Sequence, residues 1–186
     1  ISDSSGYVVD EAGIDLDLLK QVKEVERGRV ADYAARRPGA RVATGGSVWQ
    51  VPCDVALPCA TQNELDGDAA ATLVKNGCGV VAEGANMPST PEAIEVFQKA
   101  GILYAPGKAA NAGGVATSAL EMEQNASRTR WDFETANAKL TDIMADIHDS
   151  CVETAERYGQ PGNYVLGANV TGFTSVADVM IAHGII

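Results

Sequence analysis

Three stretches of this 186-residue sequence are rich in amide side chains and glycine, which bind ligands through hydrogen bonds and close approach of the backbone. They are residues 59–63, 84–87 and 107–114. The amides that we single out as ligand-binding candidates are Gln62, Asn63, Asn86 and Asn111. Amides donate and accept hydrogen bonds without exchanging protons, and no convincing nucleophile or general base accompanies them. These stretches therefore predict a binding surface without a complete catalytic centre.

Motifs that would supply other chemistry are not met. Residues 106–110 lack the spacing of a Walker phosphate loop, and Ser118 lacks the G-x-S-x-G frame of a serine hydrolase. The four cysteines form no C-x-x-C pair, and only two histidines could complete a metal site. We therefore expect no bound metal.

The second and third stretches each follow a short apolar run that suits a buried strand, Val80–Ala82 and residues 102–105. A helix is predicted between them. Thr90 can cap it, Pro91 suits its first position, and Gly101 supplies a left-handed residue after its last turn. The result is a strand, helix, strand unit.

The same unit occurs one step earlier, where residues 54–57 predict a strand and Asp66 caps a helix that continues to about Asn76 and ends at Gly77. Strands separated by helical crossovers pair in parallel. Their C-terminal ends share one edge of the sheet, where open α/β sheets bind ligands. All three amide-rich stretches are expected at this edge.

The sequence begins with a single apolar residue, Ile1, followed at once by a polar turn. We interpret Ile1 as the end of a strand whose beginning is missing. In dinucleotide-binding folds an acidic residue at the end of the second strand binds the adenosine ribose. Asp3 fits that position, and Ser4 could bind a 2′-phosphate. Because the sequence contains no G-x-G-x-x-G, the Gly-rich loop is expected upstream.

A helix is predicted over residues 15–35 by an apolar stripe of helical period, with Asp15 as its cap. Cations lie on its other faces: Lys20, Lys23, Arg27 and Arg29. One interpretation is a solvated charged face. The other is that one or two of these cations neutralise the 2′-phosphate of NADP beside Ser4.

Helices are predicted over residues 115–130, 133–158 and 175–183, with connections at 159–164 and 170–174. The predicted fold class is α/β, a Rossmann-like parallel sheet flanked by helices, incomplete at the N-terminus, with a C-terminal helical extension. We predict a partial NAD(P)-binding domain over residues 1–130 and C-terminal helices over 131–186.

The composition limits the partners. A net charge of −11 argues against a nucleic-acid partner, since phosphate binding needs a basic surface. No signal peptide and no apolar run near bilayer length is evident, so a cytoplasmic protein without a membrane partner is expected.

Four longer motifs carry a family resemblance. They read S-D-S-S-G at residues 2–6, A-L-P-C-A-T-Q-N-E-L at 56–65, A-E-G-A-N-M-P at 82–88 and P-G-K-A-A-N-A-G-G-V at 106–115. The sequence resembles the NADP-dependent glutamate dehydrogenases of the bacterial hexameric type, and only their C-terminal part. The resemblance implies interconversion of L-glutamate with 2-oxoglutarate and ammonium, NADP as coenzyme, and a homohexamer.

The resemblance also implies roles for the candidate residues at the adenosine end of the coenzyme. Asp3 and Ser4 fall at the adenosine ribose. Lys23 and Arg29 would meet the 2′-phosphate, with Arg27 as the alternative to Lys23.

At the other end of the coenzyme, Asn86 and Asn111 match the asparagines that face the nicotinamide carboxamide and its ribose, with Gln62 and Asn63 in the neighbouring loop. Val115 and Ser118 match the residues that meet the substrate side chain, with Ser118 near the distal carboxylate. The catalytic lysine and aspartate of the family come earlier and are not in this chain, so this chain alone is expected to be inactive.

Two other hypotheses stay open. A dehydrogenase of leucine or phenylalanine type would share the architecture, although the Ser118 hydroxyl suits glutamate better than an apolar side chain. A non-catalytic nucleotide-binding or assembly module would share the binding surface without the reaction.

Overall fold

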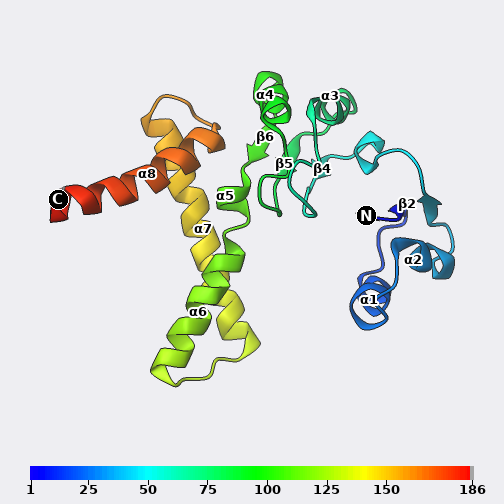
Figure 1. Cartoon of the computed structure of the whole chain (residues 1–186), viewed down its shortest axis with the longest axis horizontal. Coiled ribbons are helices and arrows are strands. Elements are labelled where there is room, and N and C mark those ends of the chain that lie inside the picture. Colours follow the sequence, from blue (N-terminus) through cyan, green and yellow to red (C-terminus); the bar gives the residue numbers. More distant parts are fainter. Residues whose placement is uncertain (185–186) are drawn as a thin grey trace. The chain divides into compact units, whose positions relative to one another are not determined.

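The structure is a computed structural model that describes residues 1–184, and the chain divides into two compact units, Ile1–Pro52 and Cys53–Ile186. Figure 1 follows the elements of each unit along the chain. Each unit is described by itself below. The expected domain boundary at residue 130 stays a prediction.

The first unit combines an antiparallel sheet with short helices. Its strands are β1 (Ser2–Asp3), β2 (Gly6–Val9) and β3 (Arg41–Ala43), in the order β1-β2-β3. Its helical segments are α1 (Leu16–Lys20), the π-helical turn η1 (Gln21–Val25), α2 (Val30–Arg36) and the 3₁₀ turn η2 (Val48–Gln50). The core of the unit consists of Val8, Val22, Val30 and Tyr33.

The prediction of a single helix over residues 15–35 is wrong, because the helix is interrupted between η1 and α2. Asp15 caps α1 as predicted, accepting a hydrogen bond from the Leu18 N–H. Arg27, however, takes a left-handed conformation (φ 58°), and Arg29 is extended before α2 begins. The Asp32 carboxylate accepts a hydrogen bond from the Arg29 N–H at 2.7 Å, which starts a new helix there. The apolar stripe persists across the break because both helices cover the same core.

The N-terminal segment also differs from the prediction. Instead of leaving a strand for a loop, residues 2–9 form a β-hairpin in which Asp3 pairs with Gly6. Gly6 has φ 146°, and a Cβ there would lie 2.3 Å from the Ala43 carbonyl oxygen of β3. Only glycine allows this approach of the strands. The hairpin depends on pairing with β3, which lies more than 30 residues away in the sequence.

The second unit contains the predicted parallel sheet. Its strands β4 (Val55–Ala56), β5 (Val80–Ala82) and β6 (Leu103–Ala105) lie in sequence order, with Val55 opposite Val80 and Ala82 opposite Ala105. The crossover helices are α3 (Gly67–Lys75) and α4 (Pro91–Ala100), which pack on each other. The α/β fold class is thus confirmed.

The predicted helix signals of this unit are confirmed one by one. Asp66 caps α3 by accepting a hydrogen bond from the Ala69 N–H at 2.9 Å. Thr90 caps α4, Pro91 is its first residue, and Gly101 ends it with φ 68°. Leu73 of α3 and Phe97 of α4 are buried in the core. The capping residues and the packing of the core thus favour the same ends for α3 and α4. This agreement is why the sequence predicts these helix boundaries.

Beyond the sheet the chain is helical. It comprises α5 (Gly107–Ala110), α6 (Gly113–Ser127), α7 (Phe133–Arg157) and α8 (Tyr164–His183). Helices α6 and α7 form a hairpin, and α8 packs across α7 (Figure 1). The connection predicted at residues 170–174 is wrong, because these residues lie inside α8.

Helix α8 continues through residues of low helix propensity because they pack on α7. A Cβ at Gly167 would lie 2.1 Å from the Cys151 carbonyl oxygen, so glycine allows the two backbones to touch. The Thr171 hydroxyl lies within hydrogen-bonding distance of the Thr154 hydroxyl (2.8 Å) and of the Ser150 carbonyl oxygen (3.2 Å). These contacts compensate for the weak local preference.

This contact gives a stability prediction. Gly167→Ala should lower the free energy of unfolding by about 1–3 kcal/mol, because the added methyl group overpacks the α7–α8 contact. Gly172→Ala, in the same helix but with open space around the added Cβ, should instead stabilise by up to about 1 kcal/mol. Urea denaturation of both variants measures the difference. Equal effects of the two substitutions would contradict the proposed packing role.

Helix α8 also corrects the expectation that no apolar run approaches bilayer length. Among residues 1–184 it is the one helix long and apolar enough to cross a membrane by length and composition. A single such helix is weak evidence for a span, because core helices of water-soluble proteins pass the same test.

Candidate functional site

The loops that follow the three parallel strands are bonded to one another at the predicted edge of the sheet. The Gly84 N–H, after β5, donates a hydrogen bond to the Pro58 carbonyl, after β4, at 2.9 Å. The Asn63 N–H donates to the Met87 carbonyl at 3.0 Å, and both residues take left-handed conformations (φ 57° and 53°). The edge is therefore a continuous surface built by backbone contacts.

The structure brings Asn86 and Asn111 together, from the loops after β5 and β6. The Asn111 amide nitrogen Nδ2 donates to Asn86 Oδ1 at 2.6 Å and to the Ala85 carbonyl at 3.1 Å. Asn86 Nδ2 and Asn111 Oδ1 make no hydrogen bond among residues 1–184, which leaves one donor and one acceptor for a ligand. This pair could bind a group that has both an acceptor and a donor, such as a carboxamide.

Gln62 and Asn63 lie in the loop after β4 and are exposed. Asn63 belongs to the bonded edge through its backbone. The Gln62 side chain makes no hydrogen bond to the described part of the chain, so it is free to meet a ligand.

Val115 and Ser118 lie one turn apart in α6, so they share one face of this helix. Val115 is 77% exposed, and the Ser118 hydroxyl donates a long hydrogen bond of 3.3 Å to the Gly114 carbonyl. A Cβ at Gly114 would meet no atom within 4 Å, so packing within the chain does not require glycine there. Neither Val115 nor Ser118 bonds to the asparagine pair within the described residues.

Sequence reasoning missed a buried polar cluster beneath these loops. Glu83, Ser89 and Tyr104 are 3%, 4% and 4% exposed. Glu83 accepts hydrogen bonds from the Ser89 and Gly107 N–H groups at 3.2 and 2.7 Å. Burial, and then the Glu83 carboxylate, raises the pKa of the Tyr104 phenol well above its usual range, so it stays neutral. The sequence does contain a signal for this cluster. Glu83 comes two positions after Val81, and residues two apart in a strand point to the same side, so an acidic side chain is expected on the core side.

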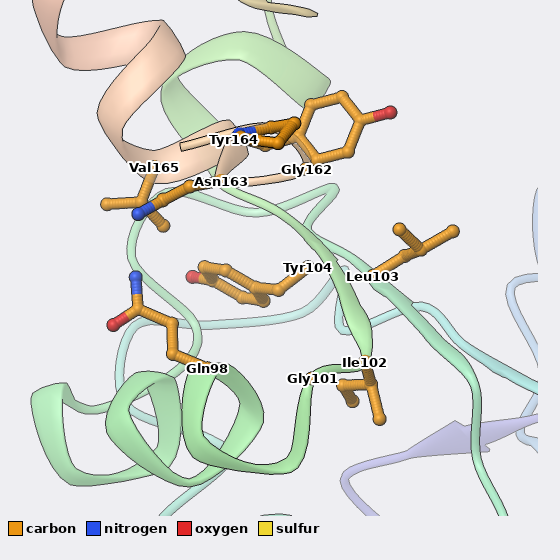
Figure 2. Close-up of a pocket in the computed structure, with 10 residues that line it drawn as sticks. Gln98, Gly101, Ile102, Leu103, Tyr104, Gly162, Asn163, Tyr164 and Val165 are labelled. Atoms are coloured by element: carbon orange, nitrogen blue, oxygen red, sulfur yellow. The ribbon is translucent and has the colours of Figure 1, made fainter. Parts of the chain in front are cut away.

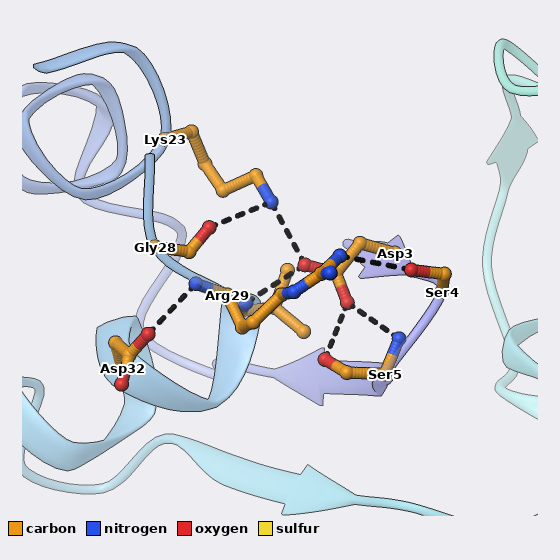
Figure 3. A network of polar contacts seen from close by, with 8 residues as sticks. Asp3, Ser4, Ser5, Lys23, Gly28, Arg29 and Asp32 are labelled. Atoms are coloured by element: carbon orange, nitrogen blue, oxygen red, sulfur yellow. Dashed lines mark hydrogen bonds and ion pairs between the residues drawn. The ribbon is translucent and has the colours of Figure 1, made fainter. Parts of the chain in front are cut away.

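In the first unit, the structure brings Asp3, Ser4, Lys23 and Arg29 together (Figure 3). The Lys23 ammonium pairs with Asp3 Oδ2 at 2.8 Å and also donates to the Gly28 carbonyl at 3.1 Å. The Arg29 guanidinium donates to the Ser4 hydroxyl at 2.9 Å. Two cations from the segment between α1 and α2 thus meet the turn of the β1–β2 hairpin.

The Asp3 carboxylate organises this cluster. Oδ1 accepts from the Ser5 N–H and hydroxyl at 2.9 and 2.6 Å, and Oδ2 accepts from the Val30 N–H at 3.0 Å in addition to Lys23. Burial opposes ionisation, but hydrogen bonds from Lys23, Ser5 and Val30 outweigh it and hold the Asp3 pKa well below its usual range. These four donors occupy the acceptor positions of the Asp3 carboxylate. The main role of Asp3 within this chain is therefore to fix the shape of the turn.

The three candidate cations of this segment make different contacts within the chain. Arg27 is exposed, has a left-handed backbone, and makes no hydrogen bond or ion pair within residues 1–184. Lys23 and Arg29 are the two that bond to the Asp3–Ser4 turn. Lys23 offsets the charge of Asp3, so among these four residues the Arg29 guanidinium carries the remaining positive charge, next to the Ser4 hydroxyl.

A pocket of about 260 Å³ in the second unit lies elsewhere (Figure 2). It is lined by the end of α4, the start of β6 and the connection between α7 and α8, including Gln98, Tyr104 and Asn163. The lining residues from α4 and β6 lie before or within the strand, and the others precede or begin α8, whereas the candidate loops follow the strand ends. Its lining includes none of the predicted site residues, although it shares Tyr104 with the buried cluster beneath the loops. No cluster of metal-binding side chains is found among the described residues.

Comparisons with known proteins identify the family of this chain. The sequence profile of the family "Glutamate/Leucine/Phenylalanine/Valine dehydrogenase" matches residues 1–184. The chain is 57% identical to the NADP-specific glutamate dehydrogenase of Escherichia coli strain K12, covering 100% of this chain and 42% of that protein. It is 51% identical to the enzyme of that name from Helicobacter pylori strain J99, covering 99% of this chain and 43% of that protein.

A solved structure shows the same fold. The glutamate dehydrogenase of Plasmodium falciparum superposes with a TM-score of 0.94 at 44% identity, covering 100% of this chain and 40% of that chain. This chain thus spans well under half the length of the relatives that it matches. Over that span, the matched profile, the identities and the superposed fold agree, and the chain belongs to the glutamate/leucine/phenylalanine/valine dehydrogenase family.

Proposed function

We propose that this chain is the coenzyme-binding part of a glutamate dehydrogenase that interconverts L-glutamate with 2-oxoglutarate and ammonium, using NADP(H). The observation that carries the proposal is the pairing of Asn86 with Asn111 at the C-terminal edge of the parallel sheet. It leaves one donor and one acceptor, matching the acceptor and donor of a nicotinamide carboxamide. The names of the relatives, NADP-specific glutamate dehydrogenase, support the choice of coenzyme and substrate.

At the other end of the coenzyme, the proposed residues are Asp3, Ser4, Lys23 and Arg29. The Lys23 and Arg29 cations and the Ser4 hydroxyl supply the charge and the hydrogen bonds that a 2′-phosphate needs. NAD has a hydroxyl at that position, which would leave Arg29 without an anionic partner. The cluster therefore supports NADP over NAD.

The coenzyme supplies the hydride chemistry when bound, and the residues of this chain orient it. Asn86 and Asn111 would hold the carboxamide, with Gln62 and Asn63 beside them. Val115 and Ser118 would meet the substrate, since the exposed first turn of α6 favours an anion such as the distal carboxylate of glutamate. To bind it, the Ser118 hydroxyl must turn away from the Gly114 carbonyl.

The proton transfers lie outside this chain in the proposal, because the family resemblance assigns them to a lysine and an aspartate that come before the matched region. An assembly of six copies is proposed from the family resemblance, and the cytoplasmic location stays a prediction. A hinge closure that brings the substrate to the coenzyme belongs to the same proposal.

The native polypeptide that contains this chain gives the direct test. We expect oxidative deamination of L-glutamate with NADP at a rate at least about tenfold above that of L-leucine or L-phenylalanine, since a site that hydrogen-bonds a polar substrate group discriminates against analogues that lack it. Faster oxidation of leucine would favour the related amino-acid dehydrogenase. Binding of NADPH without turnover of any of the three amino acids would favour a nucleotide-binding module.

A further inference from the structure

Glu83 is a buried carboxylate at the candidate edge to which none of the roles above assigns a task. It follows β5 directly, lies on the same side as the fully buried Val81, and is 3% exposed. No cation pairs with it among residues 1–184. Burial of an unpaired carboxylate is costly unless its oxygen atoms are hydrogen-bonded. Its hydrogen-bond partners therefore indicate what it does.

Both oxygen atoms of Glu83 accept hydrogen bonds from backbone groups of two different loops. Oε1 accepts from the Ser89 N–H at 3.2 Å, where the loop after β5 ends. Oε2 accepts from the Gly107 N–H at 2.7 Å, where α5 begins. The N-cap residue of α5, Pro106, makes no side-chain capping bond, so Glu83 caps this helix from the neighbouring strand.

The same two loops carry the asparagine pair. Asn111 follows Gly107 by one helical turn, and its N–H donates to the Gly107 carbonyl at 2.8 Å. Its side chain returns to the loop after β5, at Ala85 and Asn86. A Cβ at Gly107 would lie 2.7 Å from the Ala85 carbonyl oxygen, so little space separates the loops. A shift of α5 would therefore displace the Asn111 amide directly.

We propose that Glu83 is a positioning residue that fixes the loops after β5 and β6 so that Asn86 and Asn111 meet the nicotinamide end of the coenzyme. This inference rests on the proposed function. Glu83 touches neither coenzyme nor substrate in this account. It acts through the Ser89 and Gly107 N–H groups.

Only a carboxylate meets the requirement at this position. The two groups that it binds are both donors, and a carboxylate offers two acceptor oxygens. A glutamine of the same size offers one acceptor, and its NH₂ group would face the other N–H. Glu83→Gln should therefore release one of the two loops while keeping the volume of the side chain.

The test compares two ligands on the native polypeptide that contains this chain. NADPH carries both ends of the coenzyme, whereas 2′,5′-ADP carries the adenosine and its phosphates without nicotinamide. Glu83→Gln should weaken NADPH binding roughly 10- to 100-fold, because the lost hydrogen bond to a charged group holds the loop in its binding conformation by about that factor. Binding of 2′,5′-ADP should stay within about twofold, since its proposed residues lie in the first unit.

Glu95→Gln is the matched control. It makes the same change of charge and atoms in α4, where Glu95 forms an exposed i,i+4 pair with Lys99 at 3.0 Å. Both ligands should bind to this variant as they bind to the wild type, because exposed ion pairs of this kind contribute little to stability.

A second variant keeps the inference testable if Glu83→Gln does not fold. Gly107→Ala leaves the carboxylate intact but pushes α5 away from Ala85, and it should also weaken NADPH selectively. Unchanged NADPH affinity in either folded variant would overturn the positioning role. An equal loss for both ligands would also overturn it, because that result indicates a general loss of structure. If the unsubstituted protein binds neither ligand, the proposed function itself fails.

Discussion

Replacing Lys23 and Arg29 together by glutamine should reduce the affinity for NADPH roughly 100-fold and change the affinity for NADH by less than about threefold. Both cations bond to the Asp3–Ser4 turn, where the 2′-phosphate is proposed to bind. Glutamine removes the charge, and the Ser5 and Val30 donors still bond Asp3, so the turn should keep its shape. Isothermal titration calorimetry with NADPH and with NADH measures how the ratio of the two affinities changes.

Controls on neighbouring cations decide how specific this effect is. Arg27→Asn removes the alternative cation and suits the left-handed backbone, which an alanine would strain. Lys20→Gln removes the charge at the end of α1. Both should lower NADPH affinity by less than about threefold, as remote screened charges do. If Arg27→Asn had the larger effect, Arg27 would replace Lys23 in the assignment, and equal losses for NADPH and NADH would exclude phosphate recognition by this cluster.

The second large effect is expected from Asp3→Asn, which should destabilise the first unit by about 2–3 kcal/mol at pH 7. The Asp3 side chain is 13% exposed and holds the Ser5 turn and the first N–H of α2. Lys23 is 34% exposed, so solvent screens its ion pair, and most of the loss comes from the backbone donors. Asparagine can accept through one atom only.

The same substitution predicts a pH dependence. Because the folded-state pKa of Asp3 lies below its ordinary value of 3.8, its stabilising contribution is fully present above that value. The contribution is lost as the pH falls through the folded-state pKa. The difference in free energy of unfolding between wild type and Asp3→Asn should therefore be larger at pH 7 than at about pH 2.5.

Urea denaturation of this chain, followed by the fluorescence of Trp49, reports on the first unit, provided that Trp131 of the second unit is replaced by phenylalanine. Glu11→Gln is the control, since the Glu11–Arg41 pair is exposed at both ends. It should cost less than about 0.5 kcal/mol. A difference between wild type and Asp3→Asn that is independent of pH would contradict the proposed ionisation.

The parts of the fold that could be predicted are those in which local signals and packing agree. Thr90, Pro91 and Gly101 bound α4 as their chemistry predicts, and β5 begins and ends at the expected residues. The break at Arg27 could not be predicted, because it depends on the core that Val22 and Val30 share and on Asp32. The β1–β2 hairpin likewise depends on a strand that lies far away in the sequence.

The candidate site divides in the same way. The amides were visible because loops after parallel strands gather at one edge, and the Asn86–Asn111 contact confirms that these two loops meet. The sequence does not reveal that the Asp3 carboxylate accepts four hydrogen bonds from within the chain. For Glu83, the sequence shows only that a charged residue stands at a position expected in the core. Its two partners are backbone groups, which no side-chain pattern reveals.

The contact between Glu83 and Gly107 has a consequence for hydrogen exchange. The Gly107 amide lies just after a strand, where exchange with solvent is usually fast, but it is buried and bonded to a carboxylate that is 3% exposed. Its proton can exchange only when the loops after β5 and β6 separate. We therefore expect Gly107 to exchange as slowly as the amides of β5, so that these loops open together with the sheet as one cooperative unit.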